Sequence, residues 1–87
     1  MQLKALFLDR DGVINSDYGH VFKKEDIKFI EGIFDLVRDA KKKGYIVIII
    51  TNQAGIAKKI FSEEEFTNLM KWMLNQFHIR NAIIDDY

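Results

Sequence analysis

Two carboxylates and a side-chain amide follow an apolar run near the N-terminus. They are Asp9, Asp11 and Asn15, within the stretch FLDRDGVIN. Carboxylates held close together repel each other, and a hard cation such as Mg²⁺ between them relieves that repulsion. The residue types and their spacing therefore indicate a magnesium site that includes Asp9 and Asp11.

A second polar cluster follows another apolar run and consists of Thr51, Asn52 and Gln53. A hydroxyl and the backbone amides of such a loop are suitable donors to phosphoryl oxygens, while a magnesium ion neutralises developing charge. In such a site one aspartate acts as the nucleophile and the other as general acid and base. Together the two clusters predict phosphoryl chemistry.

Each cluster alone has an ordinary structural explanation. Asp and Asn are common in turns, so Asp-x-Asp after a strand is often a turn with solvated carboxylates. Thr-Asn-Gln after a strand is often a loop or a helix cap. The case for a site depends on both clusters following buried strands, because ligands bind beyond the carboxyl ends of parallel strands.

The elements that position these clusters alternate along the chain. Apolar runs at Lys4–Leu8 and Tyr45–Ile50 predict buried parallel strands, and Ala82–Ile84 predicts the start of a third strand. Helices are predicted over Ile33–Ala40 and from Ser62 to Phe77. This order predicts an α/β fold, a partial Rossmann-like parallel sheet in the order β-α-β-α-β.

The helix boundaries and faces follow from local signals. Gly44 suits the position just after the first helix, which Lys41, Lys42 and Lys43 precede. Ser62 and Glu65 form the pattern of a capping box at the start of the second. The predicted buried positions are Ile33, Leu36, Val37 and Ala40 in the first helix, and Phe66, Leu69, Met70, Met73 and Phe77 in the second.

Composition limits the classes of function. The chain has 87 residues, 48% hydrophobic and 30% charged, as expected of one small globular domain. Lys plus Arg number 13 and Asp plus Glu number 13, so no overall charge attracts nucleic acid or an acidic membrane surface, and a small-molecule substrate is expected. There is no cysteine to form disulfides, and the cytoplasm is the expected compartment.

The segments FLDRDGVIN and IIITNQAGIA closely resemble motifs I and II of the haloacid dehalogenase superfamily of phosphohydrolases. The resemblance is to the branch that contains D-glycero-D-manno-heptose 1,7-bisphosphate phosphatase and histidinol-phosphate phosphatase, and it extends through DYGHV, FIEGI and FSEEEFTNLMKWM. The arginine of the Asp-Arg-Asp triplet and the asparagine after GVI are typical of this branch. Residues 1–87 are thus interpreted as the N-terminal part of such a phosphatase domain.

The resemblance implies a role for each matching residue. Asp9 would be the nucleophile that forms an aspartyl-phosphate, and Asp11 the general acid and base. Mg²⁺ would be bound by the Asp9 carboxylate and by the backbone carbonyl of Asp11. Phosphate would be bound by Thr51 and Asn52, with Gln53 and Lys58 also assigned to phosphate binding. The implied substrate is D-glycero-D-manno-heptose 1,7-bisphosphate, which would place the protein in lipopolysaccharide biosynthesis.

The interval from Asp9 to Thr51 leaves no room for a cap domain, so the resemblance implies a capless enzyme whose rim loop, residues 16–24, would select the substrate. His20 lies in that loop, where a solvated histidine is more common than one that contacts substrate. Lys58 and Lys59 stand where the family usually has arginine and glycine. A lysine attracts phosphate but lacks the bidentate fork of arginine.

Family members continue beyond the third strand into further motifs. The cysteines and histidine that often hold zinc there are not in this sequence, so zinc is not expected. Asp85 and Asp86 precede any room for the family's third motif and are interpreted as structural. The family's strand order, 3-2-1-4-5, would leave the first strand with an open edge, which predicts self-association or pairing with a C-terminal half. Because the family's third and fourth motifs complete its site, weak or no activity is expected of residues 1–87 alone.

Three alternatives stay open. Histidinol phosphate is a second candidate substrate within the same branch. A receiver-like phosphoacceptor domain also has acidic residues beside a first parallel strand, and its acceptor would fall near Asp85. A non-catalytic remnant or interaction fragment would keep the fold signals without the activity.

Overall fold

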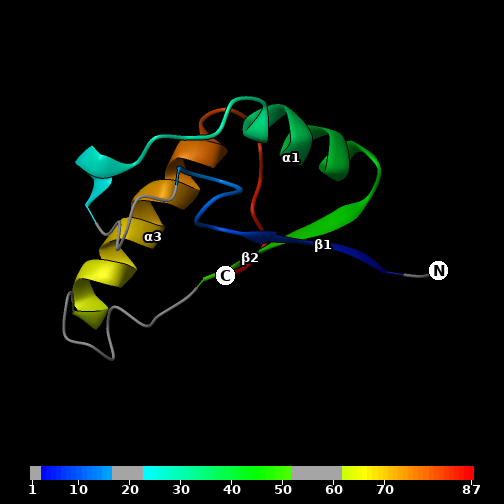
Figure 1. Cartoon of the computed structure of the whole chain (residues 1–87). Coiled ribbons are helices and arrows are strands. Elements are labelled where there is room, and N and C mark those ends of the chain that lie inside the picture. The colour runs from blue at the N-terminus through cyan, green and yellow to red at the C-terminus, as the bar shows by residue number, and fades with distance from the viewer. Residues whose placement is uncertain (1–2, 17–22, 52–61) are drawn as a thin grey trace.

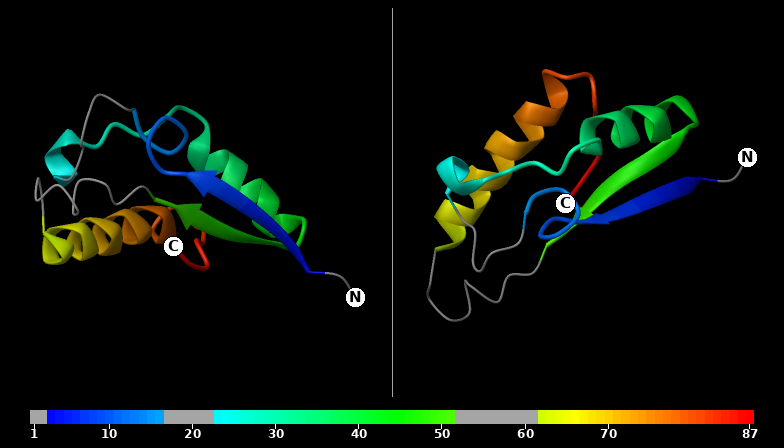
Figure 2. Two further views of the ribbon diagram at one scale, coloured as in Figure 1. Left: turned by 60° about the horizontal axis from the view of Figure 1, so that its bottom comes forward. Right: turned by 45° about the horizontal axis from the view of Figure 1, so that its top comes forward.

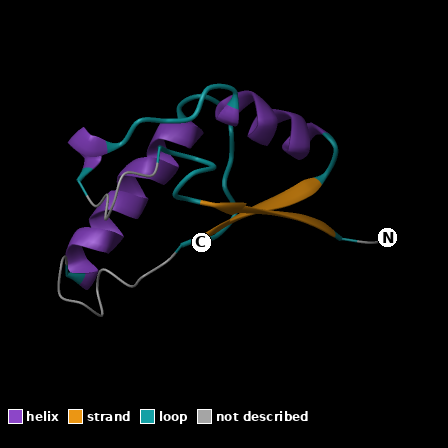
Figure 3. Ribbon diagram, viewed as in Figure 1, coloured by secondary structure: helices purple, strands orange, loops and turns teal. Residues whose placement is uncertain are grey.

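The computed structural model describes residues 3–16, 23–51 and 62–87 (Figure 1). In chain order the elements are β1 (Lys4–Asp9), a short 3₁₀ helix η1 (Lys24–Asp26), α1 (Ile33–Lys42), β2 (Tyr45–Ile50) and α3 (Glu63–His78). Figure 3 shows the two strands at one end of the molecule, with α1 alongside them and α3 beyond their carboxyl ends. The α/β class predicted from the sequence is confirmed.

The sheet is formed by β1 and β2, which are parallel and in register from Lys4 opposite Tyr45 to Asp9 opposite Ile50. Side chains alternate between the faces of a strand, so Leu8, Val47 and Ile49 share one face. All three are buried in a cluster with residues of α1 and α3. The second strand occurs as predicted, and the first extends one residue further than predicted, to Asp9.

The third strand was predicted at the wrong residues. Ala82–Ile84 is not a strand. The chain meets β2 further on, where Asp86 forms an isolated parallel bridge with Ile48 and the amide of Asp85 donates to the carbonyl of Val47 at 2.8 Å. The reason is the end of α3: Asn81 adopts a left-handed conformation (φ 58°), and the amide of Ala82 donates to the carbonyl of Phe77 at 2.9 Å. These contacts hold the chain against the end of α3 as far as Ala82, so pairing with β2 begins later than predicted. Figure 2 shows the C-terminal segment returning from α3 toward β2.

The end of α1 agrees with the sequence signals. Lys43 caps the helix, and Gly44 follows with φ 85°, a conformation that favours glycine. The predicted buried face is right for Ile33, Val37 and Ala40, but Leu36 is 47% exposed. Leu36 lines a surface hollow with Leu6 and Tyr45 near β1. Leu36 is exposed because no described element lies beyond β1 to cover its side chain.

The start of α3 also agrees with its signals. The Ser62 hydroxyl accepts a hydrogen bond from the amide of Glu65, and the Glu65 carboxylate accepts one from the amide of Ser62, each at 3.0 Å. This is the predicted capping box. All five predicted positions, Phe66, Leu69, Met70, Met73 and Phe77, are buried. Among the described helices, none is long and apolar enough to cross a membrane.

Candidate functional site

The predicted site residues that the structure describes lie at one edge of the sheet. Asp9 is the last residue of β1 and is opposite Ile50 in the parallel register. The amide of Arg10 donates to the carbonyl of Ile50 at 3.0 Å, and Thr51 comes next in the chain. The carboxyl ends of both strands therefore lie side by side, and Thr51 directly follows the residue that pairs with Asp9. Asn52, Gln53, Lys58 and His20 lie outside the described residues.

The loop after β1 is a closed turn between Arg10 and Asn15. The Arg10 carbonyl accepts from the amides of Ile14 (2.9 Å) and Asn15 (3.0 Å), and the Gly12 amide donates to the Asn15 carbonyl at 2.7 Å. Gly12 has φ 89°, in the region where side chains other than glycine are strained. The backbone thus fixes the position from which the Asp11 side chain extends.

A second segment supports this loop. The amide of Ser16 donates to the carbonyl of Lys28, and the amide of Ile30 donates to the carbonyl of Ile14, each at 2.8 Å. Asn15 also forms an isolated antiparallel bridge with Phe29. Phe29 in turn packs against aromatic side chains of both helices, Phe34, Trp72 and Phe77. The loop that carries Asp11 is therefore anchored to the core.

The Asp11 carboxylate is held by two neighbouring side chains. One Arg10 guanidinium nitrogen, Nη2, lies 3.1 Å from both carboxylate oxygens, and the side-chain amide of Asn15 donates to Oδ1 at 3.1 Å. Arg10 is 4% exposed and Asn15 is fully buried. A guanidinium thus balances one of the two carboxylates that the sequence predicted to need a cation.

The sequence identifies Arg10 only as typical of one family branch, and Asn15 also as a member of the first polar cluster. Their contact with Asp11 depends on the turn, which places residue 15 back beside residue 11. A signal was present: a basic residue lies directly between two acidic residues, and an amide donor follows within one turn of chain. Spacing alone does not say that these groups share one carboxylate.

The oxygen ligands available at this edge of the sheet fit Mg²⁺. The ion commonly takes one or two carboxylates and completes its shell with waters and phosphate oxygens. Asp9 could supply a carboxylate and Asp11 its backbone carbonyl, both of them hard oxygen ligands. No group of three or more acidic, histidine or cysteine residues gathers in the part of the chain that the structure describes. The described residues therefore offer an ion at most a pair of acidic residues here.

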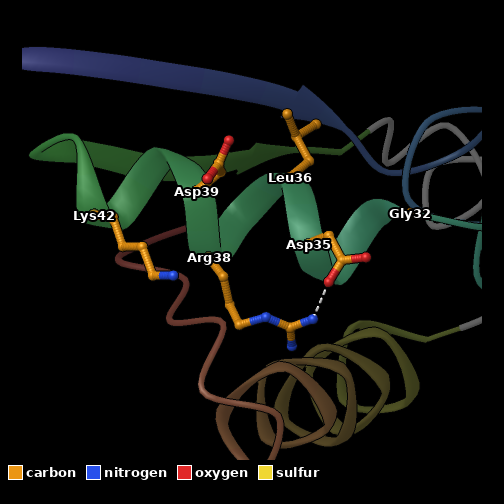
Figure 4. A pocket seen from close by; sticks show the side chains of 6 residues that line it. All are labelled: Gly32, Asp35, Leu36, Arg38, Asp39 and Lys42. Atoms are coloured by element: carbon orange, nitrogen blue, oxygen red, sulfur yellow. Dashed lines mark hydrogen bonds and ion pairs between the residues drawn. The ribbon is translucent and has the colours of Figure 1, made fainter.

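A hollow of about 450 Å³ lies elsewhere, along α1, and includes Asp35, Arg38, Asp39 and Lys42 (Figure 4). Arg38 forms an ion pair with Asp35 and donates to the backbone carbonyl of Arg80 at 2.8 Å. The Arg38 side chain thus joins α1 to the segment after α3. None of the predicted site residues lines this hollow, so we assign it no part in the site.

Comparison with known proteins identifies the family. The family described as polynucleotide kinase 3 phosphatase matches residues 4–84, most of the chain. The chain belongs to this family. It is also 51% identical over 70 residues to the D-glycero-beta-D-manno-heptose-1,7-bisphosphate 7-phosphatase of Haemophilus influenzae. Over 85 residues it is 51% identical to the D-glycero-alpha-D-manno-heptose-1,7-bisphosphate 7-phosphatase of Burkholderia mallei.

These relatives are longer than this chain. The H. influenzae match covers 80% of the chain and 38% of the relative, and the B. mallei match covers 98% and 45%. The chain therefore spans less than half the length of either.

Solved structures give the same picture of the fold. A putative HAD-like phosphatase from Mesorhizobium loti superposes with a TM-score of 0.87 at 31% identity, over 95% of this chain and 40% of its own. The D,D-heptose 1,7-bisphosphate phosphatase of B. bronchiseptica, complexed with magnesium and phosphate, superposes with a TM-score of 0.86 at 24% identity, over 97% and 48%. The resemblance to haloacid dehalogenase-like phosphatases is confirmed.

Proposed function

We propose that the chain carries the nucleophile and phosphate-binding part of a Mg²⁺-dependent phosphatase acting on D-glycero-D-manno-heptose 1,7-bisphosphate. The observation that carries the proposal is the placement of Asp9, Asp11 and Thr51 at one edge of a parallel sheet. The names of the relatives that match most of the chain support the substrate. They differ in the anomer, so the proposal extends to the sugar bisphosphate and not to one anomer.

In the proposed reaction an Asp9 carboxylate oxygen attacks the phosphorus while the bond from phosphorus to the sugar oxygen breaks. Asp11 gives its proton to that departing oxygen. Asp11 then takes a proton from a water, whose oxygen attacks the aspartyl-phosphate. The bond from phosphorus to Asp9 breaks, inorganic phosphate leaves, and both carboxyl groups return to their starting state.

The remaining groups bind the phosphate. We assign to the phosphoryl oxygens the Thr51 hydroxyl, the backbone amides around Asn52 and Gln53, and the Lys58 ammonium. Asp9 and Asp11 would hold Mg²⁺, which when bound offsets the negative charge of the phosphoryl group. We further propose that the chain pairs with a second copy or with a C-terminal half, because the outer side of β1 has no partner strand among the described residues.

The test is chemical capture of the intermediate. The chain is incubated with Mg²⁺ and synthetic heptose 1,7-bisphosphate, and borohydride then reduces any aspartyl-phosphate to homoserine, which mass spectrometry locates. We expect homoserine at position 9 and none in Asp9→Asn. Label at Asp85 would favour a receiver-like domain, and no label with any substrate would favour a non-catalytic fragment. Histidinol phosphate and a 3′-phosphorylated oligonucleotide, run in parallel, decide between substrates.

A further inference from the structure

We propose that Asn15, together with Arg10, is a positioning residue that holds the Asp11 carboxylate in one orientation for proton transfer; this inference rests on the proposed function. Three hydrogen bonds reach that carboxylate, two from Arg10 Nη2 and one from Asn15 Nδ2, all at 3.1 Å. A free carboxylate on a loop samples several rotamers. Hydrogen bonds to both of its oxygens restrict it to one rotamer.

The two donor residues are themselves fixed. The backbone amide of Arg10 extends the β1–β2 ladder by bonding to Ile50, and its side chain is 4% exposed. Asn15 is fully buried, its backbone is bonded to Arg10 and Gly12, and its side chain also donates to the carbonyl of Ser16 at 3.1 Å. A positioning group must be held more firmly than the group it positions, and Asn15 meets that condition.

These contacts contribute little to holding the fold together. Arg10 and Asp11 are neighbours in sequence, so their ion pair closes no loop and joins no distant segments. The turn from Arg10 to Asn15 is already closed by three backbone hydrogen bonds. Burying a guanidinium beside a carboxylate carries a desolvation cost that a structural role would not require here. We therefore assign to these three hydrogen bonds the orientation of the Asp11 carboxylate.

The test replaces Asn15 with a side chain of the same branched shape and no donor, Asn15→Leu. The first measurement is the pair of three-bond NMR couplings from the backbone nitrogen and carbonyl carbon of Asp11 to its carboxyl carbon, which report the side-chain rotamer. We expect values of one rotamer in the wild-type chain and averaged values in the variant. Asn75→Leu, on the exposed side of α3, is the matched control and should leave the Asp11 couplings unchanged.

The second measurement separates positioning from general loss of structure. With Mg²⁺, beryllium fluoride mimics a phosphoryl group on Asp9, whereas aluminium fluoride mimics the transferring group with an oxygen in line, where Asp11 acts. Fluorine NMR of the wild-type chain and of Asn15→Leu gives the affinity for each. We expect the variant to bind aluminium fluoride about tenfold more weakly, because a hydrogen bond to a charged group is lost, and to keep its beryllium fluoride affinity.

Each outcome decides one of the two proposals. Unchanged Asp11 couplings in Asn15→Leu, or equal weakening of both fluorides, would overturn the positioning role and make Asn15 a structural residue. Capture of neither fluoride by the wild-type chain would contradict the proposed function, while the couplings would still decide the positioning. Asn15→Ala replaces Asn15→Leu if the larger side chain prevents folding, and Arg10→Lys, which keeps one donor, should retain more aluminium fluoride affinity than Arg10→Met.

Discussion

At the scale of single residues, the loop after β1 depends on backbone conformation as much as on charge. The turn that presents Asp11 requires φ 89° at Gly12, and an added Cβ there would meet no atom within 4 Å. A substitution would therefore be resisted by backbone strain alone. Gly44 has nearly the same φ, 85°, and equally open surroundings, but it lies at the other end of the sheet. The two glycines make a matched pair.

We expect Gly12→Ala and Gly44→Ala to lower the free energy of unfolding by similar amounts, about 1 kcal/mol each, because both force an alanine into a left-handed conformation. Only Gly12→Ala should also weaken fluoride capture, since only that turn carries Asp11. Urea unfolding followed by circular dichroism measures the first effect, and fluorine NMR the second. Equal fluoride affinity in the two variants would show that the turn does not set the position of Asp11.

At the scale of elements, what could be predicted from the sequence was set locally. Three predictions that depend on residues close in sequence are confirmed: the capping box at Ser62, the glycine after α1 and the buried face of α3. The prediction of the third strand was wrong because the position of its pairing depends on the contact between Ala82 and Phe77 at the end of α3. The contacts of Asp11 were missed for a similar reason, since only the folded turn returns Asn15 to it.

The capping box offers a prediction about α3. Ser62→Ala removes the acceptor for the amide of Glu65, and we expect the free energy of unfolding to fall by about 1 kcal/mol. Ser62→Asp restores an acceptor at the positive end of the helix and should recover most of that loss. Thermal and urea unfolding of the two variants measure this. A Ser62→Asp variant no more stable than Ser62→Ala would mean that the hydroxyl matters for some reason other than capping.

The C-terminal segment is attached to β2 through Asp85. Its carboxylate accepts from the amide of Val47 and from the ammonium of Lys41, each at 2.7 Å. Burial acts to raise the pKa of Asp85, but these two hydrogen bonds and the charge of Lys41 outweigh it, so the pKa lies below its ordinary value. The carboxylate is therefore part of the structure, as interpreted from the sequence, and its charged form is the one that the fold stabilises.

A lowered pKa in the folded state means that the unfolded state takes up the proton first as pH falls. The stabilisation from Asp85 is therefore complete above its unfolded pKa and is lost as the pH drops from about 4 through the lower folded value. We expect Asp85→Asn to be less stable than wild type at pH 7, and the difference to shrink below about pH 4. Urea unfolding at several pH values checks this, and a difference independent of pH would exclude the carboxylate charge as its source.

At the scale of the whole molecule, one face of the sheet has no cover among the described residues. The register places Ala5 beside Ile46 and Phe7 beside Ile48, and side-chain alternation puts these residues and Ile50 on the face opposite the core. Phe7 is 57% exposed and Ile50 49% exposed. Parallel sheets are normally covered on both faces, so this apolar face together with the open edge of β1 predicts an association surface.

We expect the wild-type chain to associate in a concentration-dependent way, and Phe7→Glu to shift it toward the monomer, because a charge would then be buried at the contact. Ile79→Glu is the matched control: Ile79 is 61% exposed but follows α3, away from the sheet. Sedimentation equilibrium over a hundredfold range of concentration measures the association constants. If wild type is monomeric throughout, or if both variants dissociate it equally, the sheet face is not the contact, and a C-terminal half supplied as a separate chain becomes the partner to test by complementation of activity.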